Sequence, residues 1–157
     1  MNTLWDSKIL ARITKGELNK DWTVSGFSID TRSLKKGDIF CALKGTKQDG
    51  HIYLEDAFKK GAKSALISKS TKAVNGLPYL KVDNVLDALQ KIAKQARLNS
   101  NAKFIGITGS VGKTGTKEML RTAFNNIEEI YASEGKRCSR DSTIESIGLG
   151  IFEPQPK

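Results

Sequence analysis

Residues 103–119 read KFIGITGSVGKTGTKEM, and this stretch decides the fold class. Residues 103–108 form an apolar run rich in β-forming side chains, which predicts a strand. Residues 116–127 have a helical pattern, and Gly109 and Gly112 stand between the two segments. A strand, a glycine loop and a helix in this order are typical of a phosphate-binding loop in an α/β protein.

The chemistry of this loop predicts an ATP site. Backbone N–H groups of a glycine loop and of the following helix can converge on phosphate oxygens, where the helix dipole favours negative charge. Lys113 would reach the terminal phosphates and is the candidate catalytic residue, and the Thr114 hydroxyl would ligate Mg²⁺. The candidate ATP-binding residues are Gly109, Ser110, Val111, Gly112, Lys113, Thr114 and Gly115.

One position departs from the general phosphate-loop pattern, G-x-x-x-x-G-K-[ST]. That pattern requires a glycine where this chain has Ile107, so only the shorter G-x-x-G-K-T from Gly109 to Thr114 is satisfied. The alternative interpretation is a glycine-rich turn between a strand and a helix, with Lys113 as an ordinary surface lysine.

The rest of the chain alternates predicted strands with predicted helices, which indicates the α/β class. Leu4, Ile9, Leu10 and Ile13 have helical spacing, so a short N-terminal helix that ends near Gly16 is expected. The most strongly amphipathic helix is expected at 85–98. A further helix is expected at 51–62, with Gly61 as its stop. Strands are expected at 22–29, 39–43, 64–68 and 79–82.

Composition and charge exclude several classes of function. The chain has 157 residues, of which 38% are hydrophobic and 27% charged, as in ordinary globular proteins. No apolar stretch approaches the roughly 20 residues of a membrane helix and no signal peptide is visible, so we expect a cytosolic protein without a membrane partner. Cys41 and Cys138 give neither a disulfide framework nor metal-ligand spacing. The net charge of +9 is spread along the chain without a long basic run, which argues against nucleic-acid binding.

Two separate stretches of the sequence resemble the Mur ligase family, whose members build the peptide stem of peptidoglycan. The string TGSVGKT at 108–114, without an upstream glycine, is similar to the ATP loop of that family. Residues 28–68 are similar to its N-terminal domain, in which four short elements follow one another. Here these elements are Asp30-Thr31-Arg32, Gly37-Asp38-Ile39-Phe40, Asp49-Gly50-His51 and Gly61-Ala62. The resemblance covers residues 1–134.

The resemblance implies that the N-terminal domain holds the UDP end of a muramoyl peptide. Asp30, Thr31 and Arg32 are the positions carried over as UDP-binding residues. Their chemistry agrees, because arginine offers a planar fork of donors for phosphate or a pyrimidine carbonyl, and aspartate and threonine can bond imide or hydroxyl groups. The alternative for these three residues is an Asx-type turn with a solvated arginine.

Three further residues near this motif have weaker predictions. Lys44 and Lys47 flank Gly45 and could face the same ligand, although two loop lysines are more often simple surface residues. His51 follows Asp49-Gly50 and precedes a predicted helix. We expect it to be a structural or capping residue rather than a catalytic base.

The resemblance also implies a reaction, two cofactors and two substrates. The string TGSVGKTGTKEM is most similar to family members that use ATP and Mg²⁺ to join D-alanyl-D-alanine to UDP-N-acetylmuramoyl-tripeptide through an acyl phosphate. In such a reaction the protein positions the reactants and neutralises charge, with Lys113 and Thr114 at the phosphates.

The implied organisation has three parts. Residues 1–83 are expected to form the UDP-substrate domain, 84–134 the beginning of a P-loop ATPase-type α/β domain, and 135–157 a tail that does not follow the family pattern. The tail is either the unrelated ending of a truncated or frame-shifted product, which we favour, or the natural end of a short protein. A non-catalytic module that binds a nucleotide or a UDP-sugar-peptide is therefore the alternative function.

Overall fold

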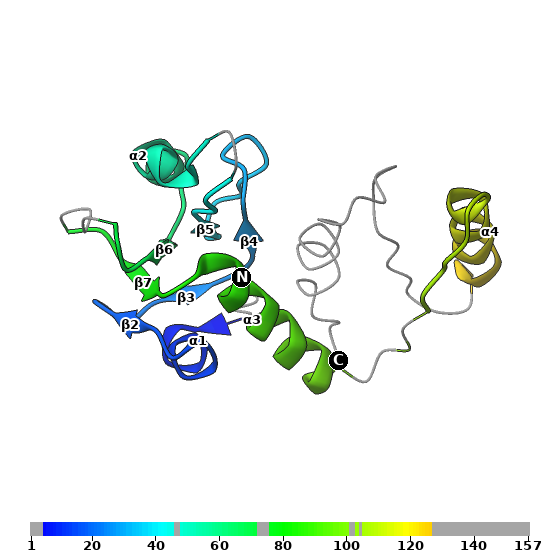
Figure 1. Ribbon diagram of the computed structural model, residues 1–157, viewed down its shortest axis with the longest axis horizontal. Helices are drawn as coiled ribbons and strands as arrows, with labels where there is room; N and C mark the ends of the chain where they lie inside the picture. Colours follow the sequence, from blue (N-terminus) through cyan, green and yellow to red (C-terminus); the bar gives the residue numbers. More distant parts are fainter. Residues whose placement is uncertain (1–4, 46–47, 72–75, 101–102, 104, 127–157) are drawn as a thin grey trace.

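The structure is a computed structural model that describes residues 5–45, 48–71, 76–100, 103 and 105–126 (Figure 1). In chain order, its elements are β1 (Trp5–Asp6), α1 (Ser7–Thr14), β2 (Glu17–Leu18), β3 (Thr23–Val24), β4 (Phe27–Ser28), β5 (Ile39–Cys41), the 3-10 helix η1 (Gly50–Tyr53), α2 (Leu54–Lys59), β6 (Ser64–Ser68), β7 (Tyr79–Val82), α3 (Val85–Asn99) and α4 (Lys113–Phe124).

A mixed five-stranded sheet organises the first hundred residues. Its strand order is β2-β7-β6-β5-β4. Strands β4 to β7 pair in parallel, whereas β2 pairs with β7 in the antiparallel sense. Strands β1 and β3 form a separate antiparallel pair. The α/β class predicted from the sequence is therefore confirmed for this part of the chain, with an antiparallel strand at one edge of the sheet.

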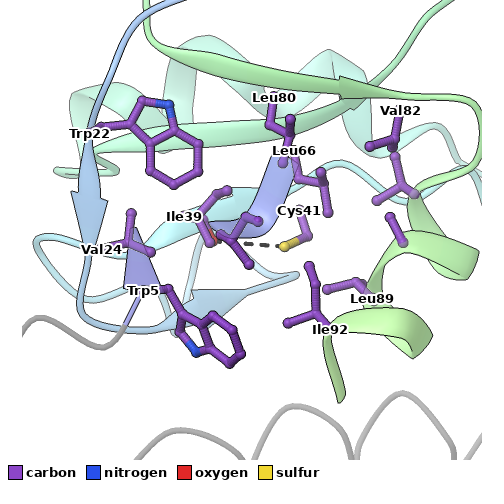
Figure 2. Close-up of a cluster of buried hydrophobic side chains, with 13 residues drawn as sticks. Trp5, Trp22, Val24, Ile39, Cys41, Leu66, Leu80, Val82, Leu89 and Ile92 are labelled. Atoms are coloured by element: carbon purple, nitrogen blue, oxygen red, sulfur yellow. Dashed lines mark hydrogen bonds between the residues drawn. The ribbon is translucent and has the colours of Figure 1, made fainter. Parts of the chain in front are cut away.

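Alternate residues of the central strands enter two different hydrophobic clusters. Ile39 and Cys41 belong to a cluster shared with α1 and α3, whereas Phe40 between them belongs to a second cluster with α2. Figure 2 shows the first cluster, in which side chains of the sheet meet Leu89 and Ile92 of α3. Both faces of the sheet are thus covered by helices, as parallel strands require.

Helix α1 confirms the amphipathic helix expected near the N-terminus, and Leu4 lies outside the described residues. The helix begins after Asp6, whose side chain caps the first turn, and it ends where Lys15 adopts a left-handed conformation with φ +56°. Leu10 is completely buried, whereas its neighbour Ile9 is 47% exposed. The two adjacent apolar residues therefore have opposite environments.

The sequence predicted a single strand over 22–29, and this prediction was wrong. Strand β3 pairs with β1, whereas β4 joins the five-stranded sheet beside β5. Gly26 lies between β3 and β4, where a Cβ atom would stand 2.6 Å from an Asp38 carboxylate oxygen. Glycine permits this close approach because it has no side chain, so the chain can pass from one sheet to the other here.

The remaining predicted elements of the first hundred residues are confirmed. The strands expected at 39–43, 64–68 and 79–82 are β5, β6 and β7, with β5 ending at Cys41. The helix expected at 51–62 starts as η1, continues as α2 to Lys59 and is followed by Gly61 with φ +102°. The helix expected at 85–98 is α3.

The domain boundary expected near Asp83 stays a prediction. Helix α3 begins directly after it, capped by the Asn84 side chain. Val85, Leu89 and Ile92 of this helix are buried in the same cluster as Leu10 of α1. The helix on the far side of the expected boundary therefore shares the core of the sheet that precedes it.

Helix α4 confirms the helix expected after the glycine loop, and it starts three residues earlier than 116. None of its residues is buried. The tail predicted at 135–157 lies outside the described residues. Among the helices that the structure describes, none is long and apolar enough to cross a membrane.

Candidate functional site

The parallel strands bring the first group of predicted site residues to one edge of the sheet. Because β4, β5 and β6 are parallel, the segments that leave their carboxyl ends emerge on the same side. Asp30 to Arg32 follow β4, the loop containing His51 follows β5, and Ser68 ends β6. The carboxyl edge of a parallel sheet is where ligands of α/β proteins bind.

Asp30 and Arg32 form a compact turn stabilised by an ion pair. One Asp30 carboxylate oxygen accepts the backbone N–H of Arg32 at 2.8 Å, which is an Asx turn. The guanidinium donates to the same carboxylate from Nε at 3.0 Å and from Nη2 at 2.6 Å. These hydrogen bonds lower the pKa of Asp30 from 3.8 to about 2. The Arg32 side chain is nevertheless 86% exposed, so it can exchange this carboxylate for another anion.

Thr31 connects this turn to helix α2. Lys60, just after the helix, donates from Nζ to the Thr31 hydroxyl at 3.4 Å and pairs with the Asp56 carboxylate at 2.9 Å. Hydrogen bonds from Lys60 and then from Thr31 lower the pKa of Asp56. No sequence motif singled out Asp56 or Lys60, and the only signal for them was their i, i+4 spacing on a predicted helix.

His51 is a structural residue, as the sequence analysis expected. Its ring lies within the fold, with Nδ1 at 2.5 Å from Asp49 Oδ1 and Nε2 accepting the backbone N–H of Ser68 at 3.0 Å. A backbone N–H can only donate, so Nε2 carries no proton and Nδ1–H donates to Asp49. Both ring nitrogens are therefore occupied in joining the loop after β5 to the end of β6.

Of the two loop lysines, Lys44 and Lys47, the structure describes only Lys44. Lys44 forms an isolated antiparallel bridge with Asp49, which places it in the loop that His51 holds. Lys47 lies outside the described residues. Whether either lysine faces a ligand stays a prediction.

The second group of site residues surrounds the start of α4. Gly112 precedes the helix with φ +82°, and Gly109 has φ +150°. Both values lie in the region that favours glycine. No side chain caps the first turn of α4, and the first amides of a helix lack partners within it. The Lys113 ammonium folds back onto the carbonyl oxygen of Gly109.

The strand expected before this loop is not present in the residues that the structure describes there. Residues 103 and 105–108 belong to no strand, and Ile105 and Val111 are exposed. A strand exists only when its backbone pairs with a neighbour, and no described strand lies next to this segment. The prediction of a strand at 103–108 was therefore wrong for these residues, although the glycine turn and the helix are present.

The Thr114 hydroxyl is the candidate magnesium ligand in the loop. The Thr114 hydroxyl is exposed in the first turn of α4, and Mg²⁺ commonly completes its coordination with water and substrate phosphates. Within the described ranges, no group of three His, Cys, Asp or Glu side chains could hold a metal ion. The loop therefore fits a metal carried in with a nucleotide, through one hydroxyl.

Comparison with known proteins identifies the family to which the chain belongs. The model of the Mur ligase family, catalytic domain, matches residues 23–97, which run from β3 into α3 and include the four parallel strands β4 to β7. Together with the relatives described next, this match shows that the chain belongs to the Mur ligase family.

Within that family, the chain is similar to ligases of more than one kind. It is 40% identical over 132 residues to the UDP-N-acetylmuramoyl-tripeptide–D-alanyl-D-alanine ligase of Rickettsia prowazekii, covering 84% of this chain and 29% of that protein. The crystal structure of MurF from Acinetobacter baumannii superposes with a TM-score of 0.74 at 25% identity, over 94% of this chain and 34% of the other. MurF from Thermotoga maritima in complex with ADP gives 0.65 at 29% identity, over 81% of this chain and 29% of the other. The chain thus spans about three tenths of the length of these relatives.

Proposed function

We propose that this chain supplies the UDP-substrate lobe and the ATP loop of an ATP-dependent ligase of peptidoglycan precursor synthesis. The reaction joins D-alanyl-D-alanine to UDP-N-acetylmuramoyl-tripeptide. The similarity to ligases of that name and to a MurF structure that holds ADP supports this proposal. Since the chain spans only about three tenths of those proteins, the proposal concerns the part of the ligase that the chain contains.

The observation that carries the proposal is the opening of helix α4 at the glycine loop. Gly112, in a left-handed conformation, leads directly into Lys113 and Thr114. The helix has no capping side chain, so its first amides are available to an anion, and the dipole favours negative charge at that end. This opening supports the proposal that residues 109–115 bind a triphosphate.

The proposed chemistry makes a carboxylate reactive. The γ-phosphoryl group of ATP is transferred to the terminal carboxylate of the tripeptide, which gives an acyl phosphate and ADP. The amine of D-alanyl-D-alanine then attacks the acyl carbon, an amide bond forms and phosphate leaves. Lys113 would neutralise charge on the transferred group, and Thr114 would hold Mg²⁺ that accompanies the nucleotide.

The UDP part of the substrate is proposed to bind at the carboxyl edge of the sheet. Asp30, Thr31 and Arg32 lie there on a turn, and the exposed guanidinium presents a planar fork of donors. A phosphate or a uracil carbonyl can accept from such a fork. The two proposed nucleotide sites then lie on different segments of the chain and can be disabled separately.

The test removes the Lys113 charge and measures both ligands. Lys113→Ala should abolish detectable binding of ATP by calorimetry and leave binding of a UDP-sugar-peptide unchanged. Lys103→Ala is the matched control, because it removes an exposed lysine from the segment before the loop. Equal loss of both ligands in Lys113→Ala would contradict the separation of the sites, and failure of the unmodified chain to bind either nucleotide would overturn the proposal.

A second candidate function is a non-catalytic module that binds the nucleotide or the UDP-sugar-peptide. The exposure of the loop and of α4 favours it, because phosphoryl transfer is promoted in a site from which water is excluded. Release of ADP in the presence of UDP-N-acetylmuramoyl-tripeptide distinguishes the two. Binding without ADP release supports the module, and ADP release supports the ligase.

A further inference from the structure

We infer that Lys60 is a second cation of the proposed UDP site and contacts the diphosphate beside Arg32. The inference rests on the proposed function, since it adds a residue to the same site. Lys60 belongs to none of the motifs on which the family resemblance depends.

Thr31 lies between the members of one ion pair in sequence and contacts the cation of a second ion pair. In the first pair, Arg32 holds Asp30 in a fork with contacts of 2.6 to 3.0 Å. In the second pair, Lys60 lies 2.9 Å from an Asp56 carboxylate oxygen and 3.4 Å from the Thr31 hydroxyl oxygen. The two cations come from segments 28 positions apart in sequence, and Thr31 connects them.

The two cations share one electrostatic environment. The charge of Lys60 helps to lower the pKa of Asp30, after the larger contribution of the Arg32 hydrogen bonds. An anion in front of the turn would therefore interact with both cations. A diphosphate has a charged group for each of them, and the forked guanidinium and the compact ammonium suit two successive phosphates.

A phosphate can displace the carboxylates that pair with these two cations. The Lys60 and Asp56 side chains are each nearly half exposed, and the Arg32 side chain is almost fully so. Exposed ion pairs of this kind contribute little to stability, so exchanging a carboxylate for a phosphate costs little. Asp30 therefore pairs with Arg32, and Asp56 with Lys60, when the ligand is absent.

The neighbouring Lys59 provides a matched control. It has the same charge and is exposed, but it is the last residue of α2 and lies about 100° away around the helix axis. Lys60, in contrast, donates to Thr31. Removing either charge changes the net charge of the chain equally, so only a local role of Lys60 separates the two variants.

The experiment measures the affinity of the full chain for UDP and for uridine by calorimetry. Lys60→Met should weaken UDP binding about tenfold, as expected for one charge-assisted hydrogen bond, and should leave uridine binding within about twofold. Lys59→Met should change both affinities by less than about twofold, and Lys60→Arg should retain most of the UDP affinity. Thermal unfolding of each variant verifies that it is folded.

Four results would overturn the inference, one of them together with the proposed function. If Lys60→Met weakened the binding of UDP and of uridine equally, Lys60 would only hold the turn at Thr31. Equal behaviour of Lys60→Met and Lys59→Met would mean that no local contact exists. An unmodified chain that binds neither ligand would remove the proposed function itself, whereas normal UDP binding in Lys60→Met removes only this inference.

Discussion

Replacing Leu10 by alanine should strongly destabilise the fold, whereas replacing Ile9 should not. Leu10 is completely buried in the cluster that joins α1, the sheet and α3, and Ile9 is 47% exposed on the same helix. Buried Leu→Ala substitutions cost about 3–5 kcal/mol, because apolar burial is lost and a cavity remains. Ile9→Ala removes a half-exposed side chain and introduces a better helix former, so we expect a cost below about 1 kcal/mol.

Urea unfolding followed by tryptophan fluorescence measures the difference. Trp5 and Trp22 are buried in the same cluster, so their emission reports on it. For a folded unit of about 95 residues, from Trp5 to Asn99, a loss of about 3 kcal/mol corresponds to a fall in Tm of roughly 12–24 °C. Equal destabilisation by the two substitutions, or a cost below about 1 kcal/mol for Leu10→Ala, would refute the placement of α1 on the sheet.

Two further predictions concern the site, and a third concerns the buried core. His51→Ala should lower the free energy of unfolding by about 1–3 kcal/mol, because the Ser68 N–H and the Asp49 carboxylate lose their partner; an unchanged urea midpoint would contradict the stabilising role of these two hydrogen bonds. The Asp30 pKa is lowered in the folded chain to about 2, so its ion pair stabilises the fold above about pH 4 and this small contribution disappears as the pH falls through about 2. Carboxyl NMR titration should show the Asp30 pKa returning towards 3.8 in Arg32→Met, and no change would argue against the ion pair in solution. Burial and the nearby Asp38 raise the pKa of Cys41, so in a Cys138→Ser background the thiol should resist a disulfide reagent until urea unfolds the chain; rapid reaction of the folded chain would contradict its burial.

Much of the candidate site could be predicted from local sequence. The Asp30-Thr31-Arg32 turn and the glycine turn before α4 both depend on residues close in sequence, and the structure contains both. The structural role of His51 was also expected from its place after Asp49-Gly50 and before a helix. Local hydrogen bonds and glycine conformations need no distant partner, which is why these features are visible in the sequence.

Local sequence did not predict the position of Lys60 or the structure of the segment 103–108. The contact between Lys60 and Thr31 joins residues 29 positions apart, and no local pattern encodes it. The apolar run 103–108 has the composition of a strand, but a strand requires a neighbouring strand to accept and donate its backbone hydrogen bonds. Composition can therefore predict a tendency to form a strand without deciding whether a partner is present.

The sequence by itself determined the alternation of strands and helices, the helix α4 after the glycine turn and the membership of the Mur ligase family. Those properties depend on periodicity, on capping residues and on short motifs, each of which lies within a few neighbouring residues. Only the tertiary structure decided that Leu10 is buried and Ile9 exposed, that residues 22–29 divide between two sheets, and that Lys60 lies beside Thr31. Each of these depends on which distant segment the chain packs against, and burial and pairing are properties of that contact rather than of the residue.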